Sequence, residues 1–127
     1  MRYLLDTCTF LYYLEGSNKL SSEALSVIES DNLIFLSQTS LWEIAIKKTI
    51  NKLDITEMTS DLERICNDGG IGIIPIKNRY FDKIQSLPFL HSDPFDRLII
   101  ATAIEEDLSI ITDDSIIKKY DEVKLLY

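Results

Sequence analysis

The chain has 127 residues, of which 46% are hydrophobic, and its 13 Lys and Arg against 21 Asp and Glu give a formal net charge of -8. This length allows one domain with a core that needs no disulfide or metal for stability, and nothing in the composition indicates disorder. The acidic excess argues against nucleic-acid binding unless basic residues cluster locally or metal ions screen the acids.

Five short apolar runs are predicted to be β-strands that are covered on both faces, as in a parallel sheet. They comprise residues 3–5, 33–36, 71–76, 109–112 and 123–126. Helical spacing between them predicts helices over residues 9–15, 21–30, 40–50, 57–66, 78–86, 95–106 and 115–120. This alternation predicts a single α/β domain over residues 1–127, with a mostly parallel five-stranded sheet sandwiched by helices.

The two cysteines and the apolar runs indicate where such a protein works. Cys8 and Cys66 are too few and too far apart for a disulfide framework or a zinc site, which favours reduced thiols in or near the core. Residues 1–6 lead directly into the first strand, which leaves no room for a signal peptide. The longest apolar run, Leu98 to Ile104, is too short to span a bilayer. We therefore expect a soluble cytoplasmic protein that does not associate with membranes.

Binding sites in parallel α/β folds form beyond the carboxyl ends of the strands, and four acidic positions are expected at that edge. Two follow strands, Asp6 and the pair Asp113–Asp114, while Glu43 and Asp96 lie near the starts of helices that begin there. Four carboxylates at one edge repel one another. A hard divalent cation such as Mg²⁺ or Mn²⁺ would offset this repulsion and would activate both a phosphate and a water molecule.

Each of these acids also has a structural interpretation as a helix cap, which typically contributes only ~1 kcal/mol. Ser40 and Glu43 fit a capping box, and Asp93-Pro94-Phe95-Asp96 places acids at the cap and third positions of a helix. Caps do not require acids, since Ser, Thr or Asn serve equally well. Other chemistry has less support: His91 is the only histidine, and the glycines of residues 69–72 precede a strand rather than a helix.

Four segments, LLDTCTFLYYL, LSQTSLWEIAIKK, HSDPFDRLIIATAI and SIITDD, resemble PIN-domain proteins of the VapC toxin class in their order and spacing. The resemblance covers essentially the whole chain. It implies a Mg²⁺- or Mn²⁺-dependent ribonuclease from a bacterial toxin–antitoxin pair, a homodimer inhibited by a cognate antitoxin. The implied reaction is in-line attack of metal-activated water on structured RNA such as tRNA, leaving a 5′-phosphate and a 3′-hydroxyl.

Carried over position by position, the resemblance makes Asp6, Glu43, Asp96 and Asp114 the catalytic and metal-binding acids. Asp114 is chosen from a Thr-x-Asp pattern that begins at Thr112, and a shift of one residue would select Asp113 instead. Asp93 belongs to the DPFD motif, but its position favours capping the helix over binding the metal.

Several neighbours of these acids have two interpretations. Arg97 is expected either to reach a substrate phosphate or an acid of the site, or to be an exposed helix arginine. Thr112 is expected to orient a water or an acid, or simply to end its strand. We expect a loop or capping role for His91, a buried position for Cys8, and core or dimer-interface positions for the aromatic side chains Trp42, Tyr12 and Tyr13.

The net charge of -8 requires a local source of positive charge if the substrate is RNA. The available cations are Lys47, Lys48, Lys52, Arg79, Lys83 and Arg97. Two alternatives to a nuclease remain: a catalytically silent PIN-type module that binds RNA or protein, and a phosphoacceptor receiver domain. Asp113–Asp114 in place of the receiver's lysine argues against the second.

Overall fold

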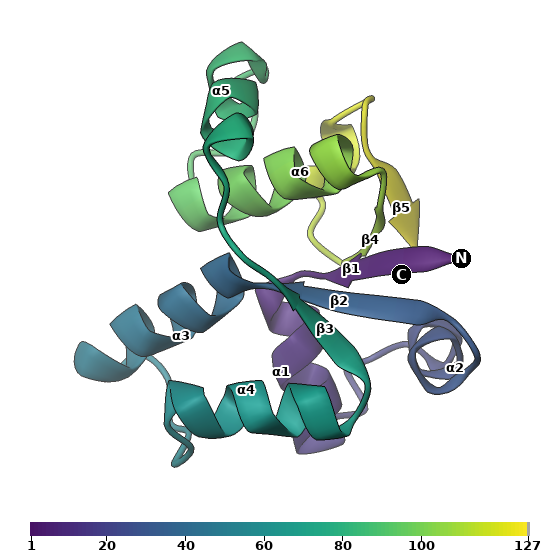
Figure 1. Cartoon of the computed structure of the whole chain (residues 1–127), viewed down its shortest axis with the longest axis vertical. Coiled ribbons are helices and arrows are strands. Elements are labelled where there is room, and N and C mark those ends of the chain that lie inside the picture. Colours follow the sequence, from purple (N-terminus) through teal and green to yellow (C-terminus); the bar gives the residue numbers. More distant parts are fainter. Residues whose placement is uncertain (127) are drawn as a thin grey trace.

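A five-stranded, all-parallel sheet forms the centre of the computed structural model, which describes residues 1–126 (Figure 1). Its strands are β1 (Arg2–Leu5), β2 (Leu33–Ser37), β3 (Ile71–Ile74), β4 (Ser109–Ile111) and β5 (Lys124–Leu126). Their spatial order is β3-β2-β1-β4-β5. The predicted α/β class is confirmed. The receiver-domain interpretation is wrong, because receiver domains have the strand order 2-1-3-4-5.

Helices cover both faces of this sheet, so that the molecule has three layers (Figure 1). The helices are α1 (Thr7–Glu15), α2 (Ser22–Glu29), α3 (Gln38–Thr49), α4 (Thr59–Asp68), α5 (Asn78–Ser86) and α6 (Pro94–Glu106). Apolar side chains of α1 to α4 pack on one face, and those of α5 and α6 pack on the other. None of the helices among residues 1–126 has the length and apolar character needed to cross a membrane.

Successive residues of the strands enter different cores, which is why the strands are apolar on both sides. Leu4 belongs to the core under α6, whereas Leu5 belongs to the core under α1, and both are fully buried. Burial of a leucine side chain of this kind contributes roughly 1.5–3 kcal/mol. The alternation fixes the register of β1 in the middle of the sheet, and it therefore fixes the position of Asp6 at the strand's carboxyl end.

Two of the predicted helices differ from the structure next to the acids of the sheet edge. The helix that contains Glu43 begins at Gln38 and is capped by Ser37, whose side chain accepts a hydrogen bond from the Thr39 amide. β2 turns directly into α3, so that Ser40 is not a cap and Glu43 lies in the second turn. Instead of a helix over residues 115–120, a short 3₁₀ helix, η1 (Ile117–Lys119), is present.

Candidate active site

The carboxyl ends of β1 and β4 place Asp6 and Thr112 side by side. Leu5 pairs with Ile111 in parallel register, so the residues that follow them leave the same edge of the sheet. Asp6 is buried and caps α1 by accepting a hydrogen bond from the Thr9 amide at 2.9 Å. Its other oxygen accepts a hydrogen bond from the Thr112 hydroxyl. Burial raises the pKa of the Asp6 carboxyl, although these hydrogen bonds partly oppose that rise.

Thr112 also connects the β1 edge to Asp114, because its hydroxyl accepts a hydrogen bond from the Asp114 amide at 3.0 Å. One carboxylate oxygen of Asp114 then accepts hydrogen bonds from the Ile116 and Ile117 amides. Partial burial raises the pKa of Asp114, but these hydrogen bonds and the contact with His91 outweigh it. The pKa of Asp114 is therefore lowered below its usual range. Asp113 is exposed to solvent. The geometry therefore favours Asp114 over Asp113 as the fourth acid.

Glu43 faces inward from α3 and is 3% exposed. One carboxylate oxygen accepts a hydrogen bond from the Thr7 hydroxyl at 2.7 Å, and the other lies 2.5 Å from the Lys47 ammonium. Thr7 is the residue that follows Asp6, so this hydrogen bond links the helix after β2 to the end of β1. Lys47, one of the predicted sources of positive charge, is thus paired with a site acid.

Asp96 lies in the first turn of α6, whose start is fixed by the side chain of Asp93. The Asp93 carboxylate accepts hydrogen bonds from the amides of Phe95 at 2.8 Å and Asp96 at 3.3 Å, as expected for a cap. Burial, followed by the negative charges of Asp93, Glu43 and Asp6, raises the pKa of Asp96 to about 7, and His91 opposes the rise. The pKa of Asp96 therefore responds to the acids Glu43 of α3 and Asp6 at the end of β1, as well as to Asp93 at the start of its own helix.

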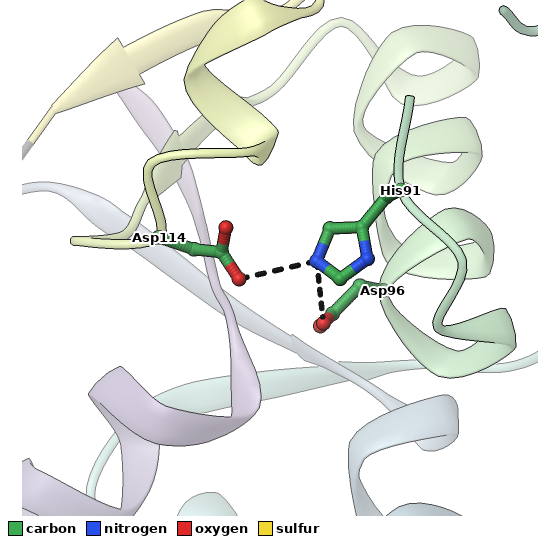
Figure 2. A group of neighbouring side chains, drawn as sticks. All are labelled: His91, Asp96 and Asp114. Carbon is green, nitrogen blue, oxygen red and sulfur yellow. Dashed lines mark hydrogen bonds and ion pairs between the residues drawn. The ribbon is translucent and has the colours of Figure 1, made fainter. Parts of the chain in front are cut away.

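His91 brings Asp96 and Asp114 together. Its Nε2 atom lies 3.1 Å from Oδ2 of Asp96 and 3.1 Å from Oδ2 of Asp114 (Figure 2). Ligand atoms of these three residues lie within 4.8 Å of one another, and this cluster does not include Asp6 or Glu43. The predicted loop position is correct, but the contact with two site acids was missed. Nothing in the sequence spacing indicates it, because His91 lies outside α6 and has no periodic relation to Asp96.

The donor set suits a hard divalent cation. Mg²⁺ prefers oxygen ligands at about 2.0–2.1 Å, so two ligands of one ion are at most roughly 4.2 Å apart. The ligand oxygens of Asp96 and Asp114 lie within 4.8 Å of each other, which is close to that range. Burial contributes most to the raised pKa of Asp96 and the neighbouring carboxylates add to it, so a cation at the site would favour the ionised form.

Both predictions for Arg97 are wrong, since it is neither exposed nor turned toward the acids. It is 9% exposed, and its guanidinium donates hydrogen bonds to the carbonyls of Ile84 at 3.0 Å and Pro88 at 3.2 Å. The guanidinium also lies over the Phe89 ring, 4.8 Å from its centroid. Arg97 therefore ties the end of α5 to α6 and has a structural role.

Other predictions about the surroundings also change. Cys8 is exposed rather than buried, whereas Cys66 is buried as expected. Trp42 is 50% exposed and packs edge-on against Phe95, which rules out a core position. Of the predicted cationic residues, five are engaged within the chain: Lys47 with Glu43, Lys48 with the Glu57 carbonyl, Arg79 with Glu106, Lys83 with Glu122, and Arg97 as above.

Comparison with known proteins agrees with this architecture. The PIN domain family model matches residues 3–123. VapBC2 from Rickettsia felis, solved bound to a DNA fragment from its promoter, has a TM-score of 0.73 and 22% identity, with 99% of this chain and 98% of that chain covered. A toxin–antitoxin complex from Klebsiella pneumoniae has a TM-score of 0.65 and 19% identity, with 98% and 96% covered. FitAcB from Neisseria gonorrhoeae has a TM-score of 0.63 and 17% identity, also with 98% and 96% covered. No curated protein sequence is significantly similar to the chain.

Proposed function

The chain belongs to the PIN domain family, and from this premise we propose that it is a Mg²⁺- or Mn²⁺-dependent endoribonuclease, the toxin of a toxin–antitoxin pair. The observation that carries the proposal is the set of carboxylates at one sheet edge, where neighbouring charges help to raise the pKa of Asp96 to about 7. Capping alone does not account for this. Asp93 caps α6, so Asp96 adds repulsion without being needed to start the helix.

Asp6, Glu43, Asp96 and Asp114 would hold the ion. When bound, the ion supplies Lewis acidity toward a phosphodiester and lowers the pKa of a water molecule. The protein's own contribution is to hold the acids in place before binding. Thr112 holds Asp6, and Thr7 holds Glu43. Hydrolysis of an RNA phosphodiester would leave a 5′-phosphate and a 3′-hydroxyl, with tRNA among the structured RNAs we propose as substrates.

The partners we propose are a cognate antitoxin and a second copy of the chain, and the place of action is the cytoplasm. The similar structures from Rickettsia felis and Klebsiella pneumoniae are of a VapBC pair and a toxin–antitoxin complex, which supports the antitoxin. Exposed aromatic side chains, including Trp42 at 50% and Phe89 at 76%, support an interface with another protein or with a second copy.

The test is cleavage of total cellular RNA by the purified chain with Mn²⁺, with Mg²⁺ and with EDTA, followed by sequencing of the fragment ends. We expect cleavage with either metal and none with EDTA. Asp6→Asn and Asp96→Asn should abolish cleavage, whereas Asp113→Asn, which changes the exposed neighbouring acid, should cleave like the wild type. A small protein encoded beside the gene should co-purify with the chain and inhibit it.

Each contrary result removes a different part of the proposal. Cleavage in EDTA would refute the metal mechanism. Cleavage by both site variants would refute the assignment of the acids. Metal binding without cleavage of any RNA would favour the catalytically silent PIN-type module, which binds a partner but does not hydrolyse it.

A further inference from the structure

The His91 ring contacts the carboxylates of two of the site acids, and its backbone is held independently of them. It is 7% exposed and lies in the loop between α5 and α6. Its amide donates a hydrogen bond to the Tyr120 hydroxyl at 2.9 Å. Tyr120 directly follows η1, so this hydrogen bond anchors the loop to the segment that also carries Asp114.

The two ring nitrogens of His91 have different surroundings. Nε2 lies between the carboxylates of Asp96 and Asp114, and Figure 2 shows both contacts leaving this nitrogen while the other nitrogen points away from both acids. Nδ1 accepts a hydrogen bond from the Asp93 amide at 3.2 Å. A backbone amide can only donate, so this contact requires a lone pair on Nδ1.

These contacts fix the tautomer of the neutral ring. Since Nδ1 supplies the lone pair, the proton of a neutral imidazole is on Nε2 and faces the two carboxylates. A metal ligand must present a lone pair, and a ligating histidine usually donates its other ring N–H to a partner. In His91 the nitrogen away from the acids, Nδ1, accepts a hydrogen bond, whereas in a ligating histidine the corresponding nitrogen would donate one. The cluster of His91, Asp96 and Asp114 is therefore not a three-ligand site.

We propose that His91 is a positioning residue whose Nε2–H group bridges Asp96 and Asp114 and holds their carboxylates ready for one metal ion. This inference rests on the proposed function, because it assigns a role at the same metal site. The two acids come from separate elements, the first turn of α6 and the loop after β4. Without a donor between them, their charges would separate them in the metal-free protein.

Positioning of this kind has a measurable consequence. Hydrogen-bond partners that orient metal ligands typically contribute about 10- to 100-fold to metal affinity. Loss of the Nε2–H donor should therefore weaken metal binding by that factor. A side chain that places an N–H group at the same distance from the backbone should restore it. Glutamine meets this requirement, whereas leucine has a similar size and no donor.

The tautomer can be measured directly, because the chain contains one histidine and hence gives one set of imidazole signals. Long-range ¹H–¹⁵N NMR of the full-length wild-type chain should be recorded at about pH 8, the pH of the stability measurements. We expect the proton on Nε2, both in EDTA and with saturating Mg²⁺. A proton on Nδ1 in either condition, or loss of the Nε2 proton with Mg²⁺, would overturn the proposal.

Mn²⁺ binding, measured from the loss of the free-ion electron paramagnetic resonance signal, tests the consequence without relying on activity. His91→Gln should bind within about threefold of the wild type, and His91→Leu about 10- to 100-fold more weakly. Binding by His91→Leu equal to wild type, or by His91→Gln as weak as His91→Leu, would overturn the proposal. If the wild type binds no Mn²⁺ although Nε2 carries the proton, the proposed metal-dependent function fails together with the positioning role. Binding with a proton on Nδ1 refutes the positioning role alone.

Discussion

Replacing Asp96 by asparagine removes a charge that the folded protein disfavours, so this variant should be more stable than the wild type in EDTA above neutral pH. The Asp96 side chain is only 17% exposed. Burial, together with the charges of Asp93 and Glu43, raises the pKa of this carboxyl to about 7. Asparagine has the same shape, and its carbonyl can still accept a hydrogen bond from His91.

The sign of the effect follows from comparing the folded and unfolded states. The unfolded carboxyl has a pKa of about 3.9, so below about pH 4 it is protonated in both states and costs no stability. Between about pH 4 and pH 7 the unfolded chain releases the proton while the folded protein keeps it, and wild-type stability falls as the pH rises. Above about pH 7 the loss is complete. A shift from 3.8 to about 7 corresponds to at most ~4 kcal/mol, and relaxation of the site lowers the expected value to ~1–3 kcal/mol.

Urea unfolding in EDTA at about pH 4 and about pH 8 measures this difference. The variant should gain stability over the wild type at the higher pH and almost none at the lower pH. Asp113→Asn is the matched control, since it removes an exposed neighbouring charge, and it should stay within ~0.5 kcal/mol of wild type. Added Mg²⁺ should stabilise the wild type but not Asp96→Asn. Equal gains at both pH values, or a less stable variant at pH 8, would refute the electrostatic argument.

Three further substitutions test other parts of the site. Asp93→Ser keeps a good helix cap, so RNA cleavage should persist, and urea unfolding should show a stability change of no more than ~0.5 kcal/mol. The substitution also removes the negative charge of Asp93. The pH-dependent stability change caused by Asp96 should therefore move to lower pH. Thr112→Val removes the hydroxyl that bridges two acids and should weaken Mg²⁺ binding about 10- to 100-fold in calorimetry, whereas Thr112→Ser should retain it. Arg97→Lys loses the planar donor that reaches two carbonyls and should lower the free energy of unfolding by ~1–3 kcal/mol while cleavage by the folded protein continues.

Much of the fold follows from the sequence because the strands are apolar on both faces. Leu4 and Leu5 enter cores on opposite sides of the sheet, and only a sheet with helices on both sides buries both. The position of Asp6 follows in turn, because Asp6 comes directly after the apolar run of β1, whereas Thr112 was predicted inside the fourth strand and lies one residue beyond its end. The start of α3 was harder to predict, since Ser37 and Ser40 both have cap-forming side chains, and only the direct turn out of β2 decides between them.

The parts that sequence reasoning missed depend on contacts between distant segments. His91 is held by Tyr120, 29 residues further along the chain, and this contact directs its ring toward the acids. Arg97 has the sequence position of an exposed residue in the first turns of a helix. It is buried because the end of α5 presents the Ile84 carbonyl to it. Neither packing arrangement leaves a periodic pattern in the sequence.

The same charges link the stability of the site to its proposed function. Thr112, His91 and Lys47 each donate to a site carboxylate, so the acids are already ordered in the metal-free protein rather than dispersed by repulsion. The pKa of Asp96 stays raised in spite of these donors, mainly through burial and further through the neighbouring carboxylates. A divalent ion would relieve the remaining repulsion. Ionised Asp96 destabilises the fold without an ion, and removal of this destabilisation on binding would increase the metal affinity. The acidic composition of the chain argues against RNA binding. At this edge of the sheet, however, the same acids would bind the cation that an RNA phosphate requires.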